Sequence, residues 1–169
     1  KLVLGPSHIS SSLEGIHVQH VTSADEMLKA CVENFNESDI SILSAAVADY
    51  TPATKADGKL KKSEDSMTIE LTKTKDILHT LGHSKKDNQV VVGFALETEN
   101  EENYAIGKLD KKKADLIVLN SLINKGAGFG HDTNQVSIFS KKGKIVESEL
   151  LSKTEIAQLI WDTIIKIYV

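Results

Sequence analysis

Residues 88–120, NQVVVGFALETENEENYAIGKLDKKKADLIVLN, hold the pattern that decides the fold. Both ends of this stretch are apolar runs of strand length, which are typical of parallel strands with both faces covered. Between them, Thr98 and Glu101 have the spacing of a capping box, in which each side chain bonds a backbone amide at a helix start. We therefore expect a helix to about Lys112 and, overall, a strand–helix–strand unit with parallel strands.

The segments before this unit repeat the alternation of strands and helices. KLVLGP (1–6) and IHVQHV (16–21) are typical of short strands, and DISILSAAV (39–47) is typical of another buried parallel strand. Ser23 and Glu26 form a second capping box. The helix after it has one apolar face, made of Met27, Leu28, Cys31, Val32 and Phe35.

Antiparallel elements and a last helix complete the pattern. MTIELT (67–72) alternates like a half-buried antiparallel strand, and a short helix is expected at 75–82 with Thr74 as its N-cap. NQVSIFS and KIVESEL flank Lys141-Lys142-Gly143 like a β-hairpin. A third capping box, Ser152 to Glu155, opens a helix whose apolar face contains Ile156, Leu159, Ile160, Ile164 and Ile167.

These elements predict an α/β fold. We expect a Rossmann-like three-layer sandwich with a mostly parallel mixed sheet, plus an antiparallel flap and hairpin. A length of 169 residues fits one domain of roughly 100–200 residues. The net charge of −4 argues against a nucleic-acid partner, and no apolar run reaches the ~20 residues of a membrane span. The single cysteine, Cys31, fits a cytoplasmic location and an inert thiol on an apolar helix face.

The predicted sheet places candidate ligand-binding residues in three loops. In open α/β sheets, ligands bind outside the carboxyl ends of the parallel strands, which here precede the loops after Ala46, Phe94 and Asn120. The first loop carries Asp49 and then a lysine-rich flap, SAAVADYTPATKADGKLKK (44–62). From the residues alone, a turn aspartate near Pro52 and a solvated charge run are the favoured interpretations of this segment.

Six motifs in order resemble the phosphopantothenoylcysteine synthetase family. They are AAVADYTP (45–52), KLKK (59–62), TKDIL (74–78), VVGFALET (91–98), YAIGKLDKKKADLIVLN (104–120) and GFGHDTNQV (128–136). AAVAD is similar to the bacterial, CTP-using form, which is often the C-terminal half of a bifunctional protein. The resemblance covers nearly the whole chain. The family's N-terminal glycine-rich βα segment, with its asparagine, has no counterpart in this sequence. The resemblance therefore implies a single domain over 1–169 that is truncated relative to the family and is inactive alone.

The resemblance implies a ligase of coenzyme A biosynthesis. The carboxylate of 4′-phosphopantothenate attacks the α-phosphate of CTP, which gives an acyl-cytidylate and pyrophosphate. The amine of L-cysteine then displaces CMP and forms the amide of 4′-phosphopantothenoylcysteine. Mg²⁺ and lysines would stabilise the phosphate charges. The implied partners are a second copy of the chain, in a homodimer, and a fused phosphopantothenoylcysteine decarboxylase domain.

The resemblance also implies the site residues. Asp49 and the backbone of the preceding strand end would contact cytosine or ribose, and Phe94 would contact the base. Lys59 would bind nucleotide and act in the cysteine-transfer step, whereas Lys61 and Lys62 stay closer to solvated charges. The implied nucleotide-binding residues are Leu43, Ser44, Ala45, Asp49, Lys59, Lys75, Asp76, Ile77, Leu78, Phe94, Lys108 and Lys112.

One of these assignments departs from the family pattern, and another is not explained by the expected geometry. Thr74-Lys75-Asp76-Ile77 stands where the family usually has Asn-Pro-Asp-Ile. Lys108 and Lys112 share a helix face, and they rest on the resemblance alone because the end of that helix is expected to point away from the strand carboxyl ends. Metal ligands are not assigned.

Other functions are weighed against the ligase. A non-catalytic Rossmann-like nucleotide-binding module is the alternative. An NAD-dependent oxidoreductase is disfavoured because no G-x-G-x-x-G follows a strand. His79 and His83 lack an evident third metal ligand, and the glycines of GAGFG (126–130) are weak evidence for a phosphate site.

Overall fold

A computed structural model describes residues 1–7, 14–56, 58–60, 66–97, 101–121 and 131–169. The chain falls into two units. One contains Lys1–Glu33 and Ala46–Ile77, and the other contains Asn34–Ala45 and Leu78–Val169. The expectation of a single truncated domain over 1–169 stays a prediction.

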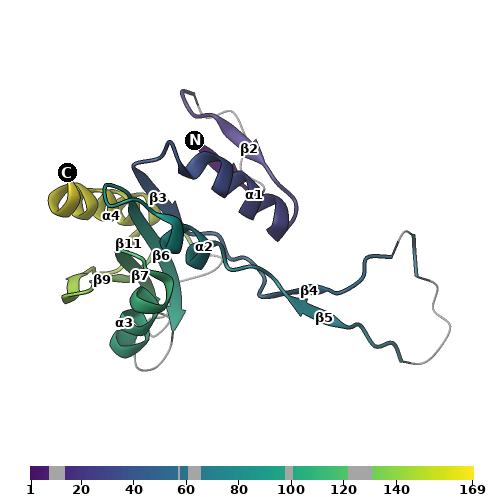
Figure 1. Ribbon diagram of the computed structural model, residues 1–169. Helices are drawn as coiled ribbons and strands as arrows, with labels where there is room; N and C mark the ends of the chain where they lie inside the picture. The colour runs from purple at the N-terminus through teal and green to yellow at the C-terminus, as the bar shows by residue number, and fades with distance from the viewer. Residues whose placement is uncertain (8–13, 57, 61–65, 98–100, 122–130) are drawn as a thin grey trace. The chain divides into compact units, whose positions relative to one another are not determined.

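A five-stranded mixed sheet forms the centre of the second unit (Figure 1). Its strand order is β10-β9-β7-β6-β3. The strands β3 (Ile40–Leu43), β6 (Val90–Glu97) and β7 (Leu116–Ser121) pair in parallel. The strand β9 (Val136–Ser140) pairs in antiparallel fashion with β7 and with β10 (Gly143–Glu147). With α3 (Glu101–Lys112) between β6 and β7, the predicted strand–helix–strand unit and the hairpin are confirmed.

Helices pack on both faces of this sheet. Along a strand, side chains alternate between the two faces. Val92 and Val118 pack on one face with Ile156, Ile160 and Ile164 of α4 (Lys153–Tyr168). On the opposite face, Leu78 of α2 (Ile77–Ser84) lies against Gly93, and α3 contacts β6 and β7. This unit is therefore a three-layer α/β sandwich, as predicted.

The strand β3 differs from its prediction. It ends at Leu43, and the residues from Ser44 to Ala46 are exposed rather than part of a buried strand. Ile42 is 44% exposed. Among the described residues, β3 is the last strand of the sheet, so only one of its edges is paired. An apolar run of this length predicted the strand, but it did not reveal that the strand lies at an edge.

The start of α2 also differs from its prediction. The helix begins at Ile77, and the hydroxyl of Thr74 donates to the carbonyl of Ala48 (2.6 Å) rather than capping the helix. A long-range bond has therefore replaced the expected N-cap. Further along α2, a Cβ on Gly82 would lie 1.9 Å from the carbonyl oxygen of Lys112, so only glycine allows α2 and α3 to approach this closely.

The described residues of the first unit form two small sheets and most of one helix. The short strands β1 (Leu2–Leu4) and β2 (Val18–His20) pair in parallel, and α1 spans Ala24–Phe35. The strands β4 (Tyr50–Pro52) and β5 (Leu71–Lys73) pair in antiparallel fashion and form a two-stranded ribbon. All three residues of β5 are exposed, so the prediction of a half-buried strand at this position was wrong.

The helix α1 keeps half of its predicted capping box. Ser23 Oγ accepts from the amide of Glu26 (3.2 Å), but the Glu26 carboxylate accepts from the amide (2.7 Å) and hydroxyl (2.8 Å) of Thr22. These bonds from Thr22 lower the pKa of Glu26. Val32 is 44% exposed, so it does not belong to the buried face as predicted, whereas Ala30 is buried.

The helix α4 confirms its capping box. Ser152 Oγ accepts from the amide of Glu155, whose carboxylate accepts from the amide of Ser152 (2.9 Å). Bonds from the Ser152 hydroxyl and amide lower the pKa of Glu155. Ile167 is 42% exposed and lies outside the apolar face to which it was assigned. Residue Ser152 also pairs with Thr133 where β11 (Leu151–Ser152) meets β8 (Thr133–Asn134).

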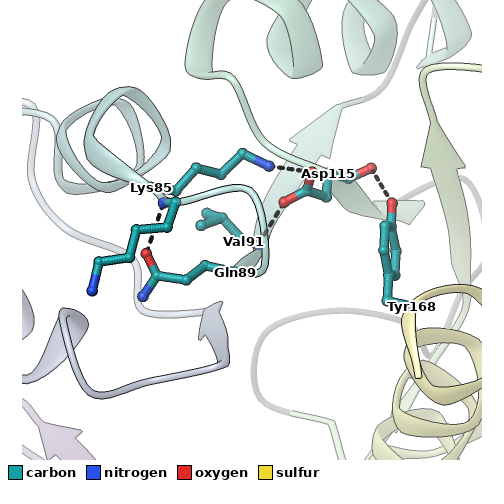
Figure 2. A network of polar contacts seen from close by, with 6 residues as sticks. Lys85, Gln89, Val91, Asp115 and Tyr168 are labelled. Atoms are coloured by element: carbon teal, nitrogen blue, oxygen red, sulfur yellow. Dashed lines mark hydrogen bonds and ion pairs between the residues drawn. The ribbon is translucent and has the colours of Figure 1, made fainter.

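A polar network joins the amino-terminal ends of β6 and β7 to the helices (Figure 2). One carboxylate oxygen of Asp115 lies 2.5 Å from Lys85 Nζ, and the other accepts from the amide of Val91 (2.8 Å). The hydroxyl of Tyr168 donates to the backbone carbonyl of Asp115 (3.3 Å). Burial, and secondarily the Asp115 charge, raise the pKa of Tyr168. Asp115 therefore ties the ends of α2, β6 and α4 to the start of β7.

Several predictions lie outside the described residues. They are the Thr98–Glu101 capping box, the role of Lys61 and Lys62, and the glycine segment 126–130. Within the described part of the chain, no helix is long and apolar enough to cross a membrane.

Candidate functional site

The carboxyl ends of the parallel strands are uneven in length. Pairing between β3 and β6 stops at Leu43 opposite Gly93, whereas pairing between β6 and β7 continues to Glu97 opposite Ser121. One edge of β6 is therefore not paired with β3 from Phe94 onward. Because ligands in open α/β sheets bind where neighbouring strands and loops diverge, this end of the second unit is the candidate site.

Lys108 reaches this end of the sheet. Its Nζ donates to the backbone carbonyl of Phe94 (3.0 Å), so two predicted site residues lie together. The phenyl ring of Phe94 is partly buried and packs against the core on the α4 face. Side chains on a helix lean towards its amino end, which here lies after β6, and this lean brings Lys108 back towards the strand end.

Lys112 lies one helical turn further from Phe94. Its backbone carbonyl packs against Gly82, where the end of α3 meets α2. The structure therefore brings Lys108 to the carboxyl end of β6 but places the backbone of Lys112 at the opposite end of the helix. The end of this helix was expected to point away from the strand carboxyl ends. That expectation holds for the backbone of Lys112 but not for the side chain of Lys108.

In the first unit, the backbone around Asp49 is fixed at the base of the β4–β5 ribbon. The carbonyl of Asp49 accepts from the amide of Thr74 (2.9 Å), and the neighbouring carbonyl of Ala48 accepts from the hydroxyl of Thr74. The side chain of Asp49 is exposed, and its carboxylate has no hydrogen-bond partner among the described residues. The described hydrogen bonds of this turn do not use the Asp49 carboxylate, and its ligand-binding role stays a prediction.

Lys59 lies in the connection between β4 and β5 and is exposed. No hydrogen bond or ion pair to it is found in the described part of the chain. The TKDIL motif divides into two kinds of residue. Lys75 and Asp76 are exposed, whereas Ile77 and Leu78 are buried in the first turn of α2. The side chains of Lys75 and Asp76 therefore reach solvent, whereas those of Ile77 and Leu78 pack in the protein.

Two asparagines near the strand ends were missed by the sequence reasoning. Asn120 precedes one of the candidate loops and Asn134 begins a predicted strand; both lie in motifs of the resemblance, but neither was assigned a site role. Asn134 is 8% exposed, and its Nδ2 donates to Oδ1 of Asn120 (3.0 Å). The available signal was an amide residue at the carboxyl end of an apolar strand, where ligand-binding residues gather.

The histidine pair and Cys31 were not assigned functional roles from the sequence. His79 and His83 stack with ring centroids 3.9 Å apart, and His83 Nδ1 lies 3.0 Å from the carbonyl of His79. The described residues contain no group of three or more His, Cys, Asp or Glu that could hold a metal ion. Burial raises the pKa of the Cys31 thiol, which disfavours the reactive thiolate.

Comparison with known proteins identifies the family. Residues 1–168 match the family described as "DNA/pantothenate metabolism flavoprotein C-terminal domain". The chain belongs to this family. It is 45% identical over 156 residues to the coenzyme A biosynthesis bifunctional protein CoaBC of Bacillus subtilis (strain 168), covering 92% of the chain and 38% of that protein.

Other relatives agree with this membership. CoaBC of Haemophilus influenzae (strain ATCC 51907 / DSM 11121 / KW20 / Rd) is 37% identical over 167 residues, covering 99% of the chain and 41% of that protein. A protein named "Cysteine/Cysteine sulfinic acid decarboxylase", from an unknown prokaryotic organism, is 51% identical over 156 residues, covering 92% of the chain and 44% of that protein. The chain thus spans about two-fifths of the length of these relatives.

Solved structures confirm the fold. The crystal structure of the C-terminal domain of CoaBC matches with a TM-score of 0.79 and 38% identity, covering 98% of this chain and 74% of that one. A DNA/pantothenate metabolism flavoprotein from Streptococcus pneumoniae matches with a TM-score of 0.77 and 21% identity, covering 96% of this chain and 79% of that one, which supports the fold alone. The resemblance found in the motifs is therefore confirmed, and the chain corresponds to the C-terminal domain of CoaBC.

Proposed function

We propose that this chain is the ligase domain that joins 4′-phosphopantothenate to L-cysteine, with CTP as the activating nucleotide. The observation that carries the proposal is the match to the C-terminal domain of CoaBC, at 38% identity over 98% of the chain. The contact of Lys108 with Phe94 at the carboxyl end of β6 supports a nucleotide site there. The CoaBC relatives are bifunctional by name, and we propose the same fusion to a phosphopantothenoylcysteine decarboxylase domain, in a cytoplasmic enzyme.

Cytosine selection is assigned to Asp49. Its exposed carboxylate can only accept hydrogen bonds, and cytosine presents a donor amine where uracil presents a carbonyl. A mismatched uracil would leave two acceptors facing each other, which costs more than a missing contact. The backbone of Leu43, Ser44 and Ala45 and the ring of Phe94, which belong to the second unit, are proposed as further contacts of the base.

The phosphate charges are assigned to lysines and to Mg²⁺. Lys59, Lys75 and Lys108 would face phosphate oxygens, with Lys112 retained on the resemblance alone. In nucleotide sites Mg²⁺ is usually held by one or two carboxylates and the substrate phosphates. The exposed carboxylate of Asp76 is one candidate ligand. When bound, Mg²⁺ would neutralise charge on the triphosphate.

A homodimer is the proposed assembly. The β4–β5 ribbon and its connection expose large apolar side chains that a second copy would cover. The exposed fractions are 53% for Tyr50, 60% for Leu60, 68% for Met67, 55% for Ile69 and 54% for Leu71. Analytical ultracentrifugation of the protein and of a Met67→Lys, Ile69→Lys variant tests this proposal, since the dimer should dissociate in the variant.

Single-turnover assays in the full protein that contains this chain test the ligase. With CTP, 4′-phosphopantothenate and Mg²⁺, pyrophosphate should be released, and the acyl-cytidylate should be found by mass spectrometry until cysteine is added. Lys59→Gln should slow amide formation about a hundredfold or more, because it removes one fixed charge-stabilising group. Lys55→Gln is the matched control, because Lys55 also lies in the connection between β4 and β5 and is also exposed. Nucleotide binding without pyrophosphate release would favour the alternative, a non-catalytic nucleotide-binding module.

A further inference from the structure

A chain of three hydrogen-bonding groups links β8 to the carboxyl end of β7. The backbone amide of Gln135 lies 2.9 Å from Oδ1 of Asn134, and Nδ2 of Asn134 lies 3.0 Å from Oδ1 of Asn120. Asn134 is 8% exposed, so its side chain has little access to water. Each bond in this chain has one possible polarity.

The polarity follows from the backbone. An N–H group can only donate, so the Asn134 atom that faces Gln135 must be the oxygen. The other end of the Asn134 amide is then its NH₂ group, and the Asn120 atom that faces it must also be an oxygen. As a result, Asn120 turns its own NH₂ group outward. No described residue accepts a hydrogen bond from that group.

Asn120 shares a face of the sheet with Phe94. Phe94 lies opposite Val118, and Asn120 follows two residues later on β7. Side chains two residues apart in a strand point to the same face, so the ring of Phe94 and the amide of Asn120 occupy diagonal positions on one face at the carboxyl end of the sheet. A ring beside a fixed pair of donors suits a flat base with an acceptor edge.

We propose that Asn134 is a positioning residue that sets the hydrogen-bond polarity of Asn120, so that the end of β7 offers donors to the acceptor edge of a pyrimidine base. In cytosine this edge carries the acceptors N3 and O2, whereas in uracil N3 carries a hydrogen and would face another donor. The inference rests on the proposed use of CTP and assigns part of its selectivity to a buried residue that acts only through Asn120.

Asn134→Asp tests the proposal by reversing the polarity. The new carboxylate still accepts from the amide of Gln135, but it cannot donate to Asn120. Asn120 then turns its NH₂ group inward and presents its oxygen to the ligand. We expect the ratio of CTP affinity to UTP affinity, measured by calorimetric titration of the full protein, to fall at least about tenfold. Asn120→Asp presents an oxygen by a second route and should shift the ratio in the same direction if Asn134→Asp does not fold.

Gln89→Glu is the matched control, because Gln89 is another buried amide, 4% exposed, at the amino end of β6. Its Nε2 donates to the carbonyls of Phe35 and Ser38 (2.7 Å each), so this change should lower stability and leave the CTP to UTP ratio unchanged. If the wild type prefers CTP and both asparagine variants keep its ratio, the inference is wrong while the proposed function stands. If the wild type binds CTP and UTP equally, cytosine reading is wrong, and the inference falls with it.

Discussion

Two ion pairs of equal length should differ widely in their contribution to stability. Lys85–Asp115 and Lys144–Glu147 each have a nitrogen–oxygen distance of 2.5 Å. The side chains of the first pair are 21% and 14% exposed, against 43% and 57% for the second. Burial, not distance, therefore decides which pair matters.

Asp115→Asn perturbs the buried pair with little change in shape. Asparagine can still accept from the amide of Val91 through its oxygen, but its NH₂ group then faces the Lys85 ammonium, and both are donors (Figure 2). Removing one partner of a buried pair costs about 3–5 kcal/mol. Because this pair retains some exposure, we expect a loss of about 2–4 kcal/mol in the free energy of unfolding.

Urea unfolding followed by circular dichroism measures this loss. Glu147→Gln at the exposed pair should cost less than about 1 kcal/mol. The double variant Lys85→Met, Asp115→Asn should recover part of the loss, because it removes the unpaired buried charge. Equal costs for Asp115→Asn and Glu147→Gln would refute the reasoning from burial.

Three further predictions concern helix packing, a strained residue and pH. Gly82→Ala should lower the free energy of unfolding by about 3 kcal/mol, because the new Cβ would meet the Lys112 carbonyl. Gly107→Ala, at a helix position with open space, should raise it by about 0.5–1 kcal/mol. Urea midpoints measure both changes. Lys113 has a φ of 53°, so Lys113→Gly should stabilise by about 1 kcal/mol, and an unchanged thermal midpoint would contradict this. Folding raises the pKa of Tyr168, so this hydroxyl stabilises the fold fully below about pH 10, and the stabilisation is lost as pH rises through the higher folded pKa. Tyr168→Phe should therefore flatten the fall in the free energy of unfolding between about pH 9 and about pH 11.

The elements that could be predicted from sequence are those fixed by local patterns. The apolar runs of β6 and β7 and the capping box at Ser152 were confirmed, because strand length and first-turn side chains are encoded within a few residues. The misassigned residues depend on contacts distant in sequence. Thr74 bonds a carbonyl 26 residues away, and Ile42 is exposed on the last described strand of its sheet. No local pattern reports either fact.

The candidate site shows the same division. The carboxyl ends of β6 and β7 followed from the alternation of elements, and Phe94 was placed there from its strand. The Asn120–Asn134 bond could not be predicted, because it joins two strand ends that are 14 residues apart in the sequence. The reach of Lys108 was also missed from geometry, since the expectation considered the end of α3 rather than the lean of a side chain one turn earlier.

The flap raises the question of why a chain fixes the backbone around one aspartate and leaves its carboxylate in water. Thr74 holds the backbone at Ala48 and Asp49 through two bonds, one of 2.6 Å and one of 2.9 Å. An aspartate that only shaped a turn would use its carboxylate for these bonds. Here the hydroxyl and amide of Thr74 fix the turn, so the carboxylate keeps its acceptor capacity. The backbone of Asp49 is already held in place by these bonds, so binding an amine donor would carry a smaller entropic cost. The turn is thus held without the Asp49 carboxylate, which is compatible with the recognition role proposed for it.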